Sequence, residues 1–314
     1  MPVSPKNPNP TTIISLRPRP DFIETPAVQE VTRRTLTYLE AGFPVHLRGL
    51  AGTGKTTLAL HIAAKIGRPV VLIVGDEQLS TADLIGGQQG HRYRRVVDRY
   101  IHSVLKYEED STQHWVDNRL TTACREGFTL IYDEFTRSRP EANNVLLTIL
   151  EERLLIVPSS LREESYLKVH PEFRAILTSN PQEYAGVHEA QDAISDRLVT
   201  LDLDYYDRET EITITAARSG VAPAVVAPIV DIVRDFRTSG EYDQAPTLRA
   251  CIMIARVVAQ QKFQVAASDP HFIALCLDIL ESKKLFSKQA REQRGQQRKM
   301  LLSLIEHHVG KKKA

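Results

Sequence analysis

The sequence predicts an α/β protein with a doubly wound parallel sheet, followed by a smaller all-helical domain. Three observations lead to this prediction. Short apolar, β-branched runs recur through the first two thirds of the chain, a glycine-rich turn motif follows the first of them, and only helical patterns occur beyond about residue 207. Apolar runs that alternate with helices are typical of a parallel sheet covered by helices on both faces.

Five runs have the length and composition of central strands buried on both faces. They are Val45–Arg48, Val70–Val74, Thr129–Tyr132, Arg174–Thr178 and Val199–Leu203. Helices are predicted over Gln29–Ala41, which Gly42 ends, and over Thr56–Ile66, which Gly67 ends.

The stretch between Val74 and Phe128 is too long for a loop in a compact domain, so it must contain at least one helix and an insertion. Further helices are expected over Arg208–Arg218, Ala224–Thr238, Thr247–Gln261, Pro270–Lys284 and the polar last stretch. We therefore divide the chain into a Pro-rich arm (1–25), an α/β domain (26–207), a helical domain (208–285) and a basic tail (286–314).

The composition is that of a globular protein, and it argues against a polyanion-binding, disulfide-rich, zinc-binding or membrane-spanning protein. Lys and Arg total 40 against 39 Asp and Glu, so the whole molecule presents no strong charge to a polyanion. The three cysteines, Cys124, Cys251 and Cys276, lie too far apart for a disulfide framework or a zinc motif. No apolar run approaches the roughly 18 residues of a membrane span, and the N-terminus lacks an apolar signal segment. These features predict a cytoplasmic protein.

Residues Gly49–Thr56 fit the pattern G-x-x-x-x-G-K-S/T between a predicted strand and a predicted helix. Glycines let backbone N–H groups converge on phosphates at a helix N-terminus, whose dipole favours anions. Lys55 would bind the β- and γ-phosphates of ATP, and the Thr56 hydroxyl would bind Mg²⁺. The full set of predicted nucleotide-binding residues is Gly49, Leu50, Ala51, Gly52, Thr53, Gly54, Lys55, Thr56 and Thr57.

Two acids, Asp133 and Glu134, end the third apolar run, where α/β proteins bind their ligands. Asp133 would hold the hydration shell of Mg²⁺, and Glu134 would orient and polarise the attacking water. Alone, such a pair also suits a helix N-cap, but beside the glycine motif it predicts ATP hydrolysis. Asn180, after the fourth run, would orient the same water, although Asn180-Pro181 also suits a plain turn.

Two arginines are candidates to complete the site. Arg197 lies just before the fifth run, where it could reach a γ-phosphate bound by a neighbouring subunit, and Arg249 opens a helix of the second domain. Positive charge at the γ-phosphate stabilises the transition state. Because surface arginines are common, spacing alone leaves both assignments open.

With these motifs in order, the chain resembles the AAA+ superfamily and, within it, the MoxR-like ATPases. The matching positions in that family are Walker A (Gly49–Thr56), Walker B (Asp133 and Glu134), sensor 1 (Asn180), the arginine finger (Arg197) and sensor 2 (Arg249). The resemblance implies a five-stranded ASCE-type αβα sandwich, a helical lid and a nucleotide-dependent hexamer. It also implies an insertion in the helix that begins near Ser80, and a hairpin within Glu151–His170.

Three segments narrow the resemblance. Trp115–Ala123, Leu130–Arg139 and Asn143–Glu152 look like the gas vesicle branch, the GvpN proteins. That branch implies ATP hydrolysis coupled to protein remodelling or assembly in gas vesicle formation or enlargement. Its clients would be gas vesicle structural or accessory proteins, with the ATPase itself associated with the vesicles. The NorQ/CbbQ branch, whose ATPases activate a metalloenzyme, is the alternative.

Other interpretations depend on segments outside these motifs. The basic and aromatic stretch 91–100 could bind nucleic acid, contact a client, or be a solvated helix face, which we favour. Ser282–Ala314, with ten Lys and Arg against two acids, is expected to be solvated rather than bound to RNA or lipid. A nucleic-acid motor is therefore not favoured. Glu134 and Asn180 argue against a small-molecule kinase, and the filled catalytic positions argue against an inactive scaffold.

Overall fold

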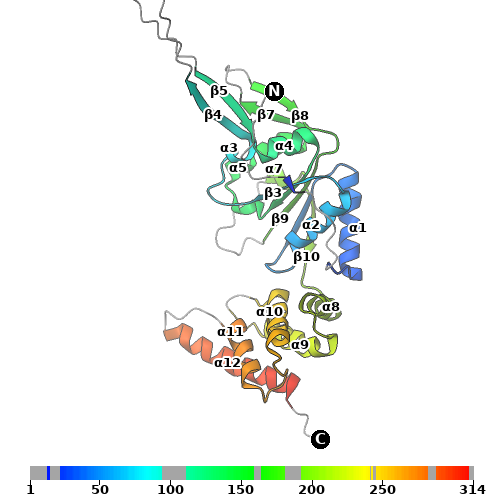
Figure 1. Cartoon of the computed structure of the whole chain (residues 1–314), viewed down its shortest axis with the longest axis vertical. Helices are drawn as coiled ribbons and strands as arrows, with labels where there is room; N and C mark the ends of the chain where they lie inside the picture. The colour runs from blue at the N-terminus through cyan, green and yellow to red at the C-terminus, as the bar shows by residue number, and fades with distance from the viewer. Residues whose placement is uncertain are drawn as a thin grey trace, which may run out of the picture. The chain divides into compact units, whose positions relative to one another are not determined.

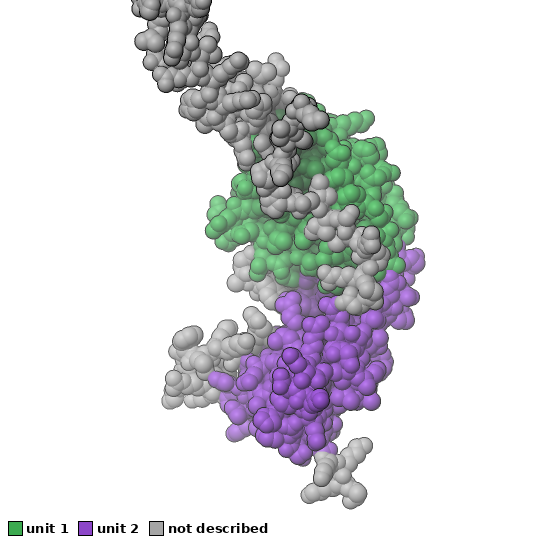
Figure 2. Space-filling model, viewed as in Figure 1, with its two compact units in different colours: residues 1–18, 34–48, 56–202 green, residues 19–33, 49–55, 203–314 purple. Residues whose placement is uncertain are grey.

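A computed structural model describes residues 13–14, 22–93, 111–158, 164–180, 192–240, 242, 245–281 and 288–310. The chain forms two compact units (Figure 2). The first comprises residues 1–18, 34–48 and 56–202, and the second comprises residues 19–33, 49–55 and 203–314. The first unit contains most of an α/β sheet, and the second contains a bundle of helices together with the glycine loop.

The sheet contains the five predicted strands, in the order β3-β6-β9-β2-β10. Their bounds are β2 Val45–Gly49, β3 Val70–Val74, β6 Thr129–Asp133, β9 Arg174–Ser179 and β10 Val199–Leu203. Parallel pairings join β3 to β6, β6 to β9 and β9 to β2, with β10 beside β2. The predicted doubly wound α/β fold is thus confirmed, and the strand ends differ from the predicted ones by at most one residue.

A sixth strand, β1 (Ile13–Ile14), pairs antiparallel with β3, and it lies in the arm where we predicted no strand. Ile13 is opposite Val71, and Ile14 is opposite Val70. These two residues are an apolar, β-branched pair within a polar, Pro-rich segment, and β3 would otherwise be an edge strand of the sheet. Pairing with β1 covers that edge, which explains why so short an apolar pair forms a strand.

Helices cover both faces of the sheet (Figure 1). Successive side chains of a strand point to opposite faces, so both faces receive side chains from each strand. Leu130 and Tyr132 of β6 belong to a buried cluster with Leu120, Cys124 and Leu146 from the helices on one face. That face carries α3 (Thr81–Ile85), α4 (Arg119–Glu126), α5 (Pro140–Asn143) and α6 (Val145–Leu150). The other face is covered by α1 (Pro26–Glu40) and α2 (Lys55–Ile66).

Two hairpins interrupt the α/β pattern, as the resemblance implied. The insertion begins with α3, capped by Ser80, and continues into the antiparallel pair β4 (Gly86–Tyr93) and β5 (Ser111–Asp117). The second hairpin consists of β7 (Leu154–Pro158) and β8 (Glu164–Lys168).

The expected helix over 91–100 is wrong at its start. His91, Arg92 and Tyr93 belong to β4, and Arg92 lies opposite Thr112 of β5. Pairing with a distant partner strand, which the local charge pattern cannot reveal, decides their conformation. Residues 94–100 lie outside the described part of the chain.

The described part of the second unit contains helices at the five predicted positions. They are α8 (Arg208–Ser219), α9 (Pro223–Ser239), α10 (Leu248–Gln261), α11 (Pro270–Leu280) and α12 (Lys288–Val309). Their core includes Phe236, Ile254 and Phe272, and α12 joins it through Leu301 and Ile305. The basic tail therefore contributes apolar side chains to the helical core. No helix within the described ranges has the length and hydropathy needed to cross a membrane.

All three cysteines are buried and free. Cys124 lies in α4, on its buried side, and Cys251 and Cys276 lie in the helical core. Burial in apolar surroundings raises the pKa of each thiol to about 12. Each thiol therefore packs in the core as a small apolar side chain does.

One buried histidine links three strands of the sheet. His46 of β2 places Nε2 2.8 Å from Ser179 Oγ of β9, and Nδ1 3.2 Å from Thr200 Oγ1 of β10. Its ring and that of Phe135 form a T-shaped pair with a centroid distance of 5.2 Å. Burial, assisted by the positive charge of Arg48 and opposed by Asp202, lowers the pKa of His46 to about 4.

This shift predicts that His46 makes stability depend on pH. The unfolded histidine has a pKa of 6.5, so below that value the unfolded state binds the proton more readily. Neutral His46 contributes fully to the free energy of unfolding above pH 6.5. This contribution is lost as the pH falls from 6.5 through about 4, by up to about 3 kcal/mol. Urea unfolding at several pH values, compared with the His46→Gln variant, measures this loss. Equal pH dependence of the two proteins would contradict it.

Candidate active site

The carboxyl ends of β6 and β9 carry a hydrogen-bonded cluster around Asp133. The Thr56 hydroxyl, in the first turn of α2, donates to both carboxylate oxygens of Asp133, at 2.7 and 2.9 Å. The Thr178 hydroxyl donates to Asp133 Oδ1 at 2.5 Å. Three elements, α2, β6 and β9, therefore meet at one carboxylate, at the edge of the sheet where α/β proteins bind their ligands.

Glu134 adopts a left-handed backbone conformation, with φ of 53°. Its N–H donates to Thr178 Oγ1 at 2.9 Å. A Cβ atom at Gly75 would lie 2.1 Å from the Glu134 carbonyl oxygen, so only glycine fits beside this turn. Such a conformation costs on the order of 1–3 kcal/mol in a non-glycine residue and persists only where its neighbours hold it. Here the Thr178 hydroxyl binds the N–H, and the lack of a side chain at Gly75 leaves room for the carbonyl oxygen.

The Glu134 carboxylate reaches two polar side chains. Asn180 Nδ2 lies 3.4 Å from Oε1, and Arg137 Nε lies 2.9 Å from Oε2. The Glu134 side chain is 30% exposed, so a water molecule can approach it. The structure thus brings together four of the predicted residues, Thr56, Asp133, Glu134 and Asn180.

Two residues of this cluster were not predicted. Thr178 is a polar residue at the end of an apolar strand, and this position could have indicated a site residue from the sequence. Arg137 lies three residues after Glu134, a spacing that brings side chains together on a helical turn. Neither signal is specific on its own, because polar residues at strand ends and arginines in turns are both common.

The glycine loop, residues 49–55, belongs to the second compact unit. Gly52 and Gly54 have φ of 78° and 86°, conformations that favour glycine. Lys55 is buried, and its Nζ donates to the carbonyl oxygens of Gly49 and Leu50 at 2.7 and 2.8 Å. Helix α2 begins at Lys55, so the loop ends at a helix N-terminus, a site suited to anions. The remaining predicted loop residues, Ala51 and Thr53, lie in the turn, and Thr57 follows in α2.

The two predicted arginines make contacts outside the Asp133 cluster. Arg197, just after α7 (Asp192–Ser195), forms an ion pair with Glu151 through Nε at 2.8 Å. Arg249 lies in the first turn of α10, and its N–H donates to Thr247 Oγ1 at 3.3 Å. Arg249 is exposed.

The oxygen donors suit a hard divalent cation. Within the residues that the structure describes, no three His, Cys, Asp or Glu side chains converge as a metal site. The Thr56 hydroxyl and the Asp133 carboxylate do converge, and oxygen ligands completed by water and phosphate are what Mg²⁺ prefers. The residues present therefore fit Mg²⁺ bound together with a nucleotide.

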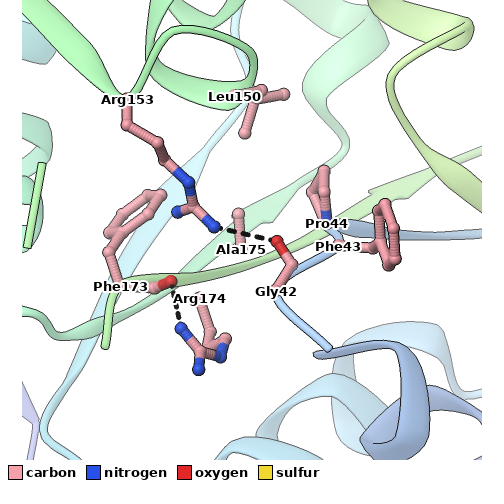
Figure 3. A pocket seen from close by; sticks show the side chains of 8 residues that line it. All are labelled: Gly42, Phe43, Pro44, Leu150, Arg153, Phe173, Arg174 and Ala175. Carbon is pink, nitrogen blue, oxygen red and sulfur yellow. Dashed lines mark hydrogen bonds between the residues drawn. The ribbon is translucent and has the colours of Figure 1, made fainter. Parts of the chain in front are cut away.

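A separate hollow lies at the opposite, amino-terminal ends of β2 and β9 (Figure 3). Arg153 Nη2 donates to the Gly42 carbonyl at 2.9 Å, and Arg174 Nη1 donates to the Phe173 carbonyl at 2.9 Å. The lining holds no acid or nucleophile. Asp133 and Glu134 lie away from this hollow, at the carboxyl end of β6.

Comparison with known proteins shows which family the chain belongs to. Residues 44–198 match the AAA domain of the dynein-related subfamily. The gas vesicle ATPase GvpN of Ancylobacter aquaticus is 59% identical over 305 residues, covering 96% of this chain and 85% of the relative. The chain belongs to the GvpN family of gas vesicle ATPases.

Two further relatives are more distant. GvpN of Haloferax mediterranei is 46% identical over 264 residues, covering 83% of this chain and 74% of the relative. NorQ of Paracoccus denitrificans is 30% identical over 178 residues, covering 57% of this chain and 58% of the relative. The predicted family resemblance is confirmed, and with it the class of enzyme, an AAA+ ATPase.

The hydrogen bonds of Thr178 predict a measurable cost when its hydroxyl is removed. Thr178→Val keeps the shape but leaves the Glu134 N–H and one oxygen of Asp133 without this partner. We expect the free energy of unfolding to fall by about 1–3 kcal/mol, measured by urea unfolding. Thr178→Ser, which keeps the hydroxyl, should lose less. A valine variant as stable as the wild type would show that these hydrogen bonds contribute nothing.

Proposed function

We propose that this chain hydrolyses ATP with the residues around Asp133 and couples hydrolysis to remodelling or assembly of another protein in gas vesicle formation. The observation that carries the proposal is the pairing of Asp133, joined to Thr56, with an adjacent Glu134 that faces Asn180. Membership of the GvpN family supports the biological setting. The expected location, in the cytoplasm and associated with gas vesicles, is part of the same proposal.

Lys55 and the loop bind the phosphates of the substrate ATP. The backbone N–H groups of the loop supply partial positive charge, and the Lys55 ammonium supplies a full charge. Thr56 binds Mg²⁺ directly, and Asp133 binds its hydration shell. When bound, Mg²⁺ neutralises the charge that develops on the phosphates.

Glu134 orients and polarises the attacking water, and Asn180 positions the Glu134 carboxylate and the water relative to each other. The Glu134 carboxylate is placed to activate a water molecule. A small-molecule kinase would instead bind its phosphoryl acceptor at this place. The partial exposure of the Glu134 side chain supports the hydrolytic assignment.

Arg197 and Arg249 complete the site in a homo-oligomer, which we propose to be a nucleotide-dependent hexamer. Arg197 is paired with Glu151 in the isolated chain. In the assembly it would exchange that exposed partner for a γ-phosphate bound by the neighbouring subunit. Exposed ion pairs contribute only about 0–1 kcal/mol, so the exchange has a low cost. Arg249 acts on the γ-phosphate from α10.

The client is a gas vesicle structural or accessory protein. The alternative, activation of a metalloenzyme as in the NorQ/CbbQ branch, has weaker support because the similarity to NorQ is lower and covers a smaller share of the chain.

The roles of Lys55 and Glu134 predict different losses. Lys55→Ala should lose nucleotide binding and turnover. Glu134→Gln should keep binding and lose about 10²–10⁴-fold in turnover, because the amide cannot polarise water. Phosphate release and equilibrium nucleotide titration measure the two effects. A Glu134→Gln protein that hydrolyses ATP at the wild-type rate would remove Glu134 from the mechanism.

The same variant identifies the client. Glu134→Gln with ATP should capture a gas vesicle structural or accessory protein from gas-vesicle-forming cells, identified by mass spectrometry. Lys55→Ala and the ADP-bound wild type serve as controls and should capture none. Capture of a metalloenzyme instead would favour the NorQ/CbbQ alternative.

A further inference from the structure

The helical unit contains a buried carboxylate shared by two arginines. Glu211 of α8 is 1% exposed, and its two oxygens accept hydrogen bonds from two residues of α9. Arg237 Nη1 lies 2.9 Å from Oε1, and Arg234 Nη1 lies 3.0 Å from Oε2. Burying such charges costs several kcal/mol, and apolar residues of similar volume would pack at least as well. The cluster therefore needs another explanation than helix packing.

That explanation lies in the other bonds of the two arginines. Arg237 Nε donates to the Pro246 carbonyl at 2.8 Å, and its guanidinium stacks 4.0 Å above the Tyr205 ring. Arg234 donates to the Tyr206 carbonyl at 2.9 Å. The cluster thus holds two non-helical segments, 204–207 between β10 and α8 and 245–247 before α10. Apolar side chains could not bind these carbonyl groups.

Both segments contact the glycine loop within the same unit. A Cβ at Gly52 would lie 2.5 Å from the Thr247 side chain, and one at Gly49 would lie 2.3 Å from the Leu203 carbonyl oxygen. The Tyr206 hydroxyl lies 3.8 Å from the Cβ position of Gly54. Each glycine of the motif therefore faces a residue that belongs to, or lies next to, the segments that the cluster holds.

We propose that Glu211, Arg234 and Arg237 are positioning residues for ATP binding. They act through the two segments, which set the shape of the loop and place the first turn of α10, where Arg249 lies. The inference rests on the proposed function. It explains why the glycine loop already has its binding shape before ATP binds. A loop that is held in its binding shape binds more tightly, because the cost of ordering it is already met. The cluster should therefore affect ATP affinity more than the hydrolytic step.

Exchange of Arg237 for lysine tests this role in the full-length chain. Lysine keeps the charge beside Glu211 but lacks the planar fork that also reaches the Pro246 carbonyl and stacks on Tyr205. We expect the dissociation constant for methylanthraniloyl-ATP, and the KM for ATP, to rise about tenfold with kcat little changed. Arg234→Lys, at a more exposed position, is the second variant if Arg237→Lys does not fold.

Arg294→Lys is the matched control. Arg294 Nε donates to the buried carboxylate of Glu281 at 2.9 Å in the same unit, and none of the loop glycines faces this pair. This variant should lower the melting temperature without changing ATP affinity.

Unchanged affinity in the folded Arg237 or Arg234 variants, or an equal loss in Arg294→Lys, would overturn the inference. A wild-type chain that binds no ATP analogue would overturn the proposed function and this inference with it. A wild type that binds and hydrolyses, with variants of unchanged affinity, removes this inference alone.

Discussion

The carboxylate of Asp133 joins the elements that meet at the carboxyl end of the sheet. It accepts hydrogen bonds from α2 through Thr56 and from β9 through Thr178. Thr178 in turn accepts the N–H of Glu134, so the same set of bonds also fixes the turn that carries the second acid. The relative placement of these groups therefore follows from hydrogen bonds between buried elements, which is how preorganised sites avoid reorganisation during the reaction.

Glu134 shows how an unfavourable backbone conformation is maintained. Its left-handed φ is opposed by the Cβ atom of any L-residue, yet the Thr178 hydroxyl accepts its N–H and the lack of a side chain at Gly75 leaves room for its carbonyl oxygen. Arg137, on the following 3₁₀ turn (Phe135–Arg137), pairs with the same side chain. The orientation of this carboxylate is thus determined by residues from three separate segments of the chain.

The sequence was informative wherever a local pattern determines the structure. Apolar runs such as Val70–Val74 give the strands, and Gly49–Thr56 gives the loop, because the periodicity and the φ requirements are local properties. It was uninformative where a distant partner decides. Ile13–Ile14 becomes a strand because β3 offers an edge, and residues 91–93 extend because β5 pairs with them. Thr178 and Arg137 likewise matter only through neighbours that folding brings to them.

The burial of Cys124, Cys251 and Cys276 has a practical consequence. A thiol reacts as the thiolate, and burial disfavours that form and blocks access to reagents. These are all the cysteines of the chain, so maleimide chemistry at neutral pH meets an unreactive background. A single cysteine introduced on the surface of the folded protein would be the one labelled position, and fluorophores could report distances without removal of any native residue.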